Sequence, residues 1–296
     1  MKKLLPLFLL ILIGCSEPEP FEIYYDNGQL ESEGTNRNGK LDGPYKSYFF
    51  NGQLKEDSNY KDGKLDGLYK IYYQWNGQLK LEGTYKDGKE DGPYKSYFEF
   101  GQQLESEGTY KNGNLDGPYK SYYQYGQLKE DSTYKDGKLD GPYKYYHDIG
   151  TYRFKVDNYK QLELEGTYKD GNLDGPYKFY YDNGQIEEEG TYKNGELDGP
   201  YISYYENGQL KRELIFNNGK EDGTDKLYYE DGQLWNEEIY NNGKLDGLSK
   251  YYHENGQLYR EETYKDGKKH GSFKMYDENG QLQQEKNFNN GKLLVE

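Results

Sequence analysis

A motif of 24 or 25 residues recurs along nearly the whole chain, and this repetition limits the folds that the chain can adopt. One aliphatic column marks the repeat, and a single interval of 34 residues interrupts its spacing. Its members are Leu30, Leu54, Leu79, Leu104, Leu128, Leu162, Ile186, Leu210, Leu234, Leu258 and Leu282. Such a period is typical of arrays whose units stack on their neighbours. We therefore expect function to lie in a repeated surface and not in one assembled active site.

A targeting segment precedes the repeats. Lys2 and Lys3 make a short basic start, residues 4–13 are apolar, and Cys15 follows Gly14. An apolar run of that length is too short to span a bilayer and fits the core of a signal peptide. The ending resembles the lipobox of bacterial lipoproteins, which implies that Cys15 carries lipid, such as palmitate, and becomes the mature N-terminus. An ordinary signal peptide with a chance cysteine is the alternative.

The chain divides into three parts on this interpretation. We predict a signal peptide at 1–14, a tether at 15–20 after the lipidated cysteine, and a repeat array at 21–296 with an insertion at about 147–160. Ser16 after Cys15 resembles lipoproteins that are sent to the outer membrane of double-membraned bacteria. We therefore expect a lipid-anchored protein of the cell envelope.

Composition narrows the classes of partner. A net charge of -15 argues against nucleic acid and against direct adhesion to anionic lipid headgroups, because both reward clustered cations. Cys15 is the sole cysteine, so an internal disulfide is excluded. The chain is very polar, yet it holds 38 tyrosines, which disordered chains lack.

Each repeat is predicted to form two strands and two turns. In one copy, residues 177–181 and 186–193 are the strands, the first turn is Asp182 to Gly184, and the second is Asn194 to Gly199. Asn-Gly and Asp-Gly supply the positive-φ residues of tight hairpins. Proline follows the second turn glycine in many copies, as at Pro200, and we place it at the first strand position. The predicted fold class is all-β.

The period of two along a strand assigns side chains to faces. Counted from the aliphatic column, the fourth residue is often glycine and the sixth is nearly always aromatic, as in Gly83 and Tyr85. We therefore expect Leu, Gly and Tyr on one face, where glycine leaves room for a ring. The third residue is acidic and is expected on the other face, together with a Lys and a Tyr of the companion strand.

That second tyrosine column is the predicted binding surface. Its members are Tyr48, Tyr72, Tyr97, Tyr122, Tyr146, Tyr180, Tyr204, Tyr228 and Tyr252. Within the insertion, Tyr152, Arg153, Phe154 and Lys155 bring rings and cations to a mainly acidic chain, so they are added as a candidate contact.

The run Glu-Gly-Thr-Tyr-Lys-Asp-Gly-Lys-Leu-Asp-Gly-Pro-Tyr-Lys, present in close variants at 132–144 and 165–178, resembles the bacterial variant of the MORN repeat. The likeness covers essentially residues 21–296. It implies an elongated, single-layer, twisted antiparallel sheet of successive β-hairpins. It also implies membrane-associated scaffolding, and some bacterial members are filed as antitoxins.

Catalytic and metal sites are not expected. The repeated aspartates of the Asp-Gly turns lie two strands apart, about 9.6 Å at ordinary strand spacing, which is too far for one calcium ion to bridge. The three histidines, His147, His253 and His270, show no zinc spacing, and motifs for a nucleophile elbow, a phosphate loop or a dinucleotide are absent from the sequence. We expect neither enzymatic activity nor a cofactor.

Three functions fit these observations. The first is an envelope scaffold that binds a protein partner through its tyrosine-rich face. The second is a binder of carbohydrate or cell-wall glycan, since exposed rings suit the faces of sugars. The third, implied by the family resemblance, is an antitoxin-like or immunity-type protein that binds a toxin.

Overall fold

The computed structural model describes residues 17–148 and 161–294. The chain divides into two compact units, Met1–Leu104 with Tyr110–Gly113 and Glu105–Thr109 with Asn114–Glu296. The described residues form β-strands and turns, with no helix among them. The predicted all-β fold of repeated antiparallel hairpins is therefore confirmed.

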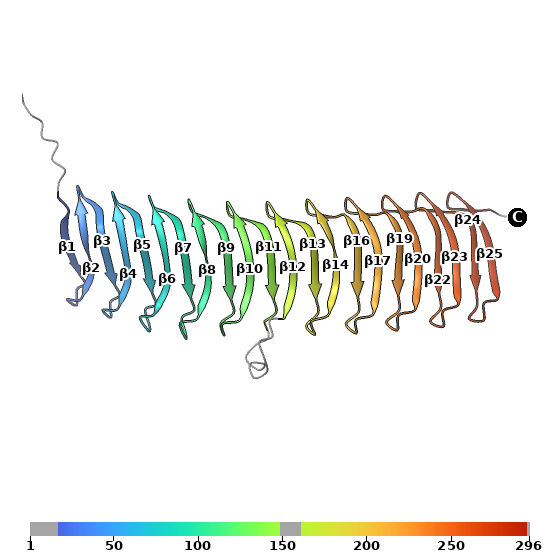
Figure 1. The fold of residues 1–296 in the computed structure, drawn as a ribbon, viewed down its shortest axis with the longest axis horizontal. Coiled ribbons are helices and arrows are strands. Elements are labelled where there is room, and N and C mark those ends of the chain that lie inside the picture. Colours follow the sequence, from blue (N-terminus) through green and yellow to red (C-terminus); the bar gives the residue numbers. More distant parts are fainter. Residues whose placement is uncertain (1–16, 149–160, 295–296) are drawn as a thin grey trace, which may run out of the picture. The chain divides into compact units, whose positions relative to one another are not determined.

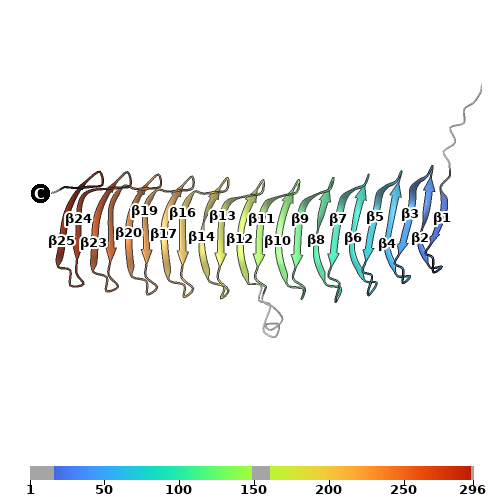
Figure 2. The ribbon, with the colours of Figure 1, turned by 180° about the vertical axis from the view of Figure 1, so that it is seen from behind.

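The first unit holds seven complete strands, and β8 (Leu104–Lys111) has residues in both units. Each strand pairs with the next in antiparallel fashion, as neighbouring strands show in Figures 1 and 2. Their bounds are β1 (Glu19–Tyr24), β2 (Leu30–Arg37), β3 (Lys40–Tyr48), β4 (Leu54–Lys61), β5 (Lys64–Tyr72), β6 (Leu79–Lys86) and β7 (Lys89–Tyr97). Strand β1 begins inside the segment predicted as a tether.

The second unit continues the same hairpin pattern (Figure 1). Its first strands are β9 (Asn114–Tyr122), β10 (Leu128–Lys135), β11 (Lys138–Tyr146), β12 (Leu162–Lys169), β13 (Asn172–Tyr180), β14 (Ile186–Lys193), β15 (Glu196–Leu197), β16 (Gly199–Tyr204) and β17 (Leu210–Asn217). They are followed by β18 (Lys220–Glu221), β19 (Gly223–Tyr228), β20 (Leu234–Asn241), β21 (Lys244–Leu245), β22 (Gly247–Tyr252), β23 (Leu258–Lys265), β24 (Lys268–Tyr276), β25 (Leu282–Asn289) and β26 (Lys292–Leu294).

Two kinds of turn alternate along each unit. The short turn is the pair Asn38–Gly39 and its equivalents, in which both residues have positive φ, here 53° and 75°. This is the backbone of a type I′ hairpin, whose twist matches that of the strands. The long turn, as at residues 25–29, closes with hydrogen bonds from Tyr25 N to Gln29 O and from Gly28 N to Tyr25 O, both 2.8 Å.

The second predicted turn was too long. In the copy discussed above, Asn194 and Gly195 make the turn, whereas Glu196–Leu197 and Gly199–Tyr204 are already strand. The glycine of the Leu-Asp-Gly segment instead marks an irregularity inside the companion strand, with φ 114° at Gly199. Proline after that glycine is consequently not the first residue of a strand: Pro44 lies within β3 and Pro200 is the second residue of β16.

The predicted face of the aliphatic column was wrong. A β-bulge separates Leu54 from Glu56, because Leu54 pairs with Tyr48 whereas Glu56 pairs with Ser47. Residues directly opposite each other share a face, and one extra residue in a strand reverses the alternation. The aliphatic column therefore lies with the Glu, Lys and Tyr columns, and not with the glycine column. The bulge recurs at Tyr122–Leu128, Tyr180–Ile186 and Tyr228–Leu234.

Two faces can now be defined. The serine face carries the positions of Ser32, Gly34, Tyr45, Ser47 and Tyr60, and most of the buried side chains are small serines on it. A Cβ on Gly34 would lie 3.2 Å from a ring atom of Tyr45, so the missing side chain makes room for that ring, as predicted. Edge-to-face ring pairs continue the packing, as at Tyr45–Tyr60, with ring centroids 5.5 Å apart. Each such pair contributes about 0.5–1.5 kcal/mol.

The other surface is named the ladder face here, after the positions of Leu54, Asp57, Lys46 and Tyr48. Contacts between successive repeats hold both faces in register. At the long turns the hydroxyl of Tyr25 donates to Tyr48 O at 2.8 Å. At the short turns the backbone amide of Gly63 donates to Leu41 O at 2.8 Å. Stability should therefore follow contacts between neighbouring repeats.

Candidate functional site

The ladder face repeats one hydrogen bond through both units. Its tyrosine donates the hydroxyl hydrogen to the acidic residue fifteen positions earlier, and Tyr48 to Glu33 Oε1 is the shortest example at 2.6 Å. The further pairs are Tyr97–Glu82, Tyr122–Glu107, Tyr180–Glu165, Tyr204–Glu189, Tyr228–Glu213 and Tyr276–Glu261. The column chosen from sequence as a binding surface is thus also part of the sheet's own hydrogen bonding.

Lysines complete the pattern. Glu165 accepts the hydroxyl of Tyr180 at 2.7 Å through Oε1, and its Oε2 lies 3.7 Å from Nζ of Lys144. Glu189 has the equivalent two neighbours in the next repeat, the hydroxyl of Tyr204 at 3.1 Å and Nζ of Lys178 at 3.0 Å. Each carboxylate therefore connects a cation on one neighbouring strand with a ring on the other. These pairs are partly exposed, so each ion pair contributes about 0–1 kcal/mol, and the repetition matters more than any member.

Burial and the adjacent carboxylates shift the ladder tyrosines in one direction. Burial first, and then the hydrogen bond to glutamate, raise the pKa of Tyr48, Tyr122 and Tyr228 to about 12. The pKa of Tyr72 and of Tyr146 is also raised, chiefly by burial. These phenols consequently stay protonated at neutral pH and act as donors. The surface offers half-buried rings between alternating charges.

Several predicted residues lie outside the described part of the chain. They are Cys15, the candidate lipidation site, and Tyr152, Arg153, Phe154 and Lys155 of the insertion. The residues that flank the insertion are described, and they match an ordinary long turn. His147 N donates to Gln161 O at 2.9 Å, and Tyr146 pairs with Leu162 through the usual bulge.

The repeated aspartates of the Leu-Asp-Gly segments have a structural role. Asp66 Oδ2 accepts the backbone amide of Asp87 at 3.3 Å, and Asp140 Oδ2 accepts that of Asp170 at 3.3 Å. They therefore tie a companion strand to the short turn of the next repeat. Over residues 17–148 and 161–294, groups of three or more His, Cys, Asp or Glu placed to hold a metal ion are absent.

The serine face changes character between β17 and β24, which sequence analysis missed. Asp225 occupies the position of Tyr45 and is 2% exposed, and Arg212 donates to it from Nε at 2.9 Å and from Nη2 at 2.8 Å. Arg212 also donates to Glu221 at 2.8 Å. The hydrogen bonds with Asp225 raise the pKa of the Arg212 guanidinium. A buried, fully paired charge thus replaces a tyrosine ring.

Two further carboxylates stand where most earlier repeats have glycine or serine. Glu238 accepts the hydroxyl of Tyr240 at 3.1 Å and forms a very short hydrogen bond with that of Tyr251. Glu262, 1% exposed, accepts the hydroxyl of Tyr264 at 2.9 Å and lies 2.7 Å from Nζ of Lys269. The column that holds Gly or Ser in the first seven copies holds Leu214, Glu238 and Glu262 here, and this change is the sequence signal that could have located the region.

A cleft of about 720 Å³ adjoins these charges at the long-turn edge of the second unit. Aromatic side chains form much of its lining, including Tyr229, Trp235, Tyr251 and Tyr259. The rings of Tyr229 and Trp235 lie 6.3 Å apart, and those of His253 and Tyr259 lie 5.0 Å apart. Arg260 places its guanidinium carbon 4.0 Å from the centre of the Tyr251 ring. Sequence analysis did not select this cleft either.

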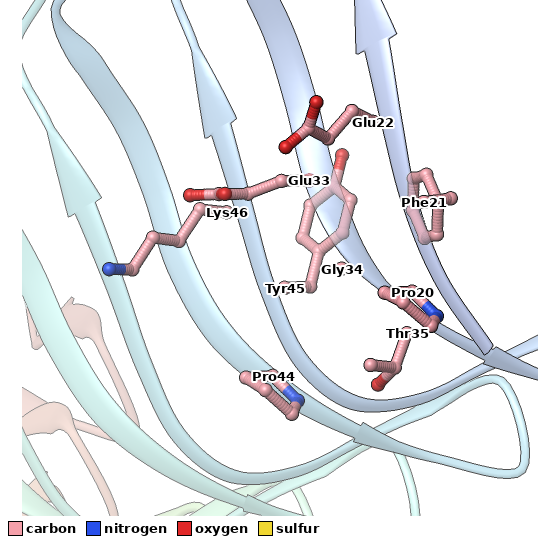
Figure 3. A pocket seen from close by; sticks show the side chains of 9 residues that line it. All are labelled: Pro20, Phe21, Glu22, Glu33, Gly34, Thr35, Pro44, Tyr45 and Lys46. Atoms are coloured by element: carbon pink, nitrogen blue, oxygen red, sulfur yellow. The ribbon is translucent and has the colours of Figure 1, made fainter. Parts of the chain in front are cut away.

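The first unit has a pocket of about 590 Å³ beside β1, shown in Figure 3. The rings of Phe21 and Tyr45 lie on either side of Gly34, and Glu22, Glu33 and Lys46 supply charges (Figure 3). A Cβ on Gly34 would lie 3.2 Å from a ring atom of Phe21, so the ring packing of the serine face continues to the edge strand. The pocket thus continues the repeat pattern and adds no new chemistry.

The sequence profile of the MORN repeat variant family matches ten segments of the chain. They are residues 20–40, 41–62, 65–87, 90–112, 115–136, 173–194, 197–218, 221–242, 245–266 and 269–296. The sequence has no match among curated proteins. In the part of the chain that the structure describes, no helix is both long and apolar enough to cross a membrane.

Solved structures give only distant likenesses. A crystal structure of TcdB2-TccC3-Cdc42 is 12% identical with a TM-score of 0.21, over 91% of this chain and 18% of that one. A crystal structure of TcdB2-TccC3-TEV is 13% identical with a TM-score of 0.20, over 93% of this chain and 15% of that one. The chain thus spans less than a fifth of either relative.

Proposed function

Since the chain belongs to the MORN repeat variant family, we propose that it is a non-catalytic scaffold of the cell envelope that binds a protein partner. In this proposal a lipid on Cys15 anchors it to a membrane, the outer membrane in a double-membraned host. The ladder face is the binding surface. MORN repeats fit a scaffold made of equivalent units. The lipid anchor and the protein partner are what this proposal adds to the family assignment.

One observation carries the proposal, namely the recurrence of the same Lys–Glu–Tyr contact at equivalent positions. Lys144, Glu165 and Tyr180 form one copy, and Lys178, Glu189 and Tyr204 form the next. A surface built from one repeated contact suits a partner that is itself extended or repetitive. Tyrosine supplies a large amphipathic contact area at low cost in conformational entropy.

The ladder face can be tested by capture of proteins from envelope extracts. The first variant replaces Lys144, Lys178 and Lys226 with Ala, which removes ladder cations and leaves the rings in place. The control replaces Lys138, Lys220 and Lys244, the first residues of β11, β18 and β21, with Ala. We expect the ladder variant to lose partners that the parent and the control both retain. Identical capture by all three proteins would contradict the proposal.

The anchor needs a separate experiment. We expect Cys15→Ala to move the protein from the membrane fraction to the soluble fraction. The variant lacks the residue that carries the lipid, and the lipid is the proposed membrane anchor. Labelling with a palmitate analogue should mark the parent and not the variant. A variant that stays with membranes in high salt would contradict lipidation at Cys15, while the ladder-face experiment would remain informative on purified protein.

A further inference from the structure

The aromatic cleft in the second unit is lined by rings from two successive long turns. We propose that it binds an uncharged, β-linked oligosaccharide, with Trp235 and Tyr259 as the two stacking platforms. Trp235 is 42% exposed and lines the cleft together with Tyr229, Tyr251 and Tyr259. Pockets for small ligands combine apolar or aromatic walls with a few polar groups that fix orientation.

The repeats themselves show why these two positions are unusual. The residue at the bulge, directly after the aliphatic column, is Glu or Lys in the first eight copies of that column. In three of these copies a lysine ammonium group lies over the ring of the long-turn tyrosine: Lys80 over Tyr73 at 5.5 Å, Lys129 over Tyr123 at 5.7 Å and Lys211 over Tyr205 at 5.7 Å. A cation then occupies the ring face.

In the next two copies the bulge residue is aromatic instead. Trp235 stands beside Tyr229 and Tyr259 stands beside His253, so each long turn presents two neighbouring rings. The exchange removes a charge from each turn and adds apolar area. It therefore converts a turn whose ring is covered by a cation into an aromatic wall.

The walls are held by contacts between repeats. The hydroxyl of Tyr229 donates to Tyr252 O at 3.0 Å, and Nε2 of His253 lies 3.4 Å from Tyr276 O. Asn255 Nδ2 donates to Glu278 O at 3.0 Å, and both residues line the cleft. Tyr229 and His253 are thereby fixed, and each packs beside one of the two stacking platforms. Rings with a fixed neighbour lose less conformational freedom when a ligand stacks on them.

The spacing suits an extended sugar chain. Trp235 lies in β20 and Tyr259 in β23, and β22 pairs with both strands. The two platforms are therefore two strands apart, about 9.6 Å at ordinary strand spacing. This separation corresponds to two sugar units of an extended β-linked glycan. A single monosaccharide would reach one platform only.

Charge selects against acidic glycans. Glu254 and Glu278 line the cleft, and the chain as a whole carries a net charge of -15. The positive charge of Arg260 is directed elsewhere, because Nη2 lies 3.4 Å from the buried carboxylate of Glu262 and the guanidinium stacks on Tyr251. The carboxylates can instead accept hydrogen bonds from sugar hydroxyl groups, and the amide of Asn255 can donate to them.

The cleft can be tested independently of the protein scaffold proposed above. Tyr251 and Arg260 pair on the serine face, whereas Tyr252 belongs to the ladder column and also lines the cleft. The lysines replaced in the ladder variant, Lys144, Lys178 and Lys226, are not among the residues that line it. Loss of protein capture in the ladder variants would leave the cleft intact. The two proposals can therefore fail separately.

The test uses chitotetraose as the probe and the purified chain. Trp235→Lys and Tyr259→Lys each restore the residue type of earlier repeats, so folding should be preserved, as checked by circular dichroism and melting. Trp75→Ala is the matched control, because Trp75 is 83% exposed and does not line the cleft. Calorimetry should show saturable binding by the parent and by the control, and at least about tenfold weaker binding by each Lys variant.

A second measurement does not depend on the folding of those variants. In the Trp75→Phe protein, Trp235 is the sole tryptophan, so its fluorescence should change with chitotetraose and saturate at the concentration that calorimetry gives. A glycan array should also favour uncharged β-linked chains over acidic ones. The proposal is overturned if the parent does not bind, if both Lys variants bind as the parent does, or if acidic glycans are preferred.

Discussion

Arg212 holds Asp225 with two parallel hydrogen bonds, from Nε to Oδ1 at 2.9 Å and from Nη2 to Oδ2 at 2.8 Å. The residues lie thirteen positions apart in the sequence, on the paired strands β17 and β19, and Asp225 is 2% exposed. Elsewhere the position of Asp225 mostly carries tyrosine. The second unit has therefore exchanged ring packing for a buried ion pair while keeping its backbone pairing.

This pair predicts an asymmetric response to mutation. Asp225→Ala should lower the free energy of unfolding by about 2–3 kcal/mol, because it removes two charged hydrogen bonds from a partly exposed guanidinium that keeps Glu221 as its remaining partner. Replacing both residues with Leu should recover most of the lost stability, because neither charge is then left without its partner. Denaturant unfolding of the three proteins checks this. Equal losses in the single and double variants would argue that the pair acts through packing alone.

Alkaline pH should weaken the fold through its tyrosines. The folded pKa of Tyr48, Tyr122 and Tyr228 is raised to about 12, while an unfolded tyrosine ionises near about 10. Their contribution is therefore complete below about pH 10 and is lost as pH rises through about 12. The unfolding midpoint, followed by circular dichroism, should fall across this window.

The control for that experiment is the triple Tyr→Phe variant at the same positions. It should be less stable at neutral pH, by about 1 kcal/mol for each lost hydroxyl, but less sensitive to alkali because phenylalanine does not ionise. A variant with the same alkaline slope as the parent would show that other groups govern the transition.

Gly247, in one of the Leu-Asp-Gly segments, is required by space as well as by backbone conformation. Gly247 has φ 149°, and a Cβ there would stand 2.8 Å from Cβ of Ile239. Gly243, in the preceding short turn, has φ 80° and only ordinary contact with Lys220. Gly243→Ala should cost about 1–2 kcal/mol from the left-handed backbone alone, and Gly247→Ala should cost more.

The double variant Gly247→Ala with Ile239→Gly separates these two causes, because glycine at 239 removes the Cβ that the new side chain would meet. Gly247→Ala should cost less in the Ile239→Gly protein than in the parent, and thermal melting of the two single variants and the double variant is the measurement. If Gly247→Ala costs the same in both proteins, the strain lies in the backbone and not in contact with Ile239.

The insertion between β11 and β12 should be dispensable for folding. Tyr146 pairs with Leu162, and His147 N reaches Gln161 O, as at the long turns of other repeats. Replacing residues 149–160 with Asn-Gly gives the usual turn, whose glycine has positive φ at Gly28. We expect the unfolding free energy to change by less than about 1 kcal/mol. A large loss would show that this segment contributes to the sheet, and unchanged stability with lost partner capture would support its predicted contact role.

The repeat period, the Asn-Gly and Asp-Gly turns and the all-β fold class were determined by the sequence alone, because each depends on residues close together in the chain. The short turns at Asn38–Gly39 and its equivalents follow from residues that accept positive φ, and the packing of Tyr45 beside Gly34 follows from the absence of a side chain. These are local steric effects, and repetition makes them easy to read.

Tertiary structure decided the rest. The bulge beside Leu54 moved the aliphatic column to the ladder face, because one unpaired residue reverses every later side chain. The pairing of Arg212 with Asp225, and the grouping of Trp235 and Tyr259 at one cleft, required strand register, since the interacting residues belong to different strands. These positions depart from the repeat in the sequence, but sequence analysis did not select them. Only the fold brought them together, because contacts across a sheet depend on register and not on distance along the chain.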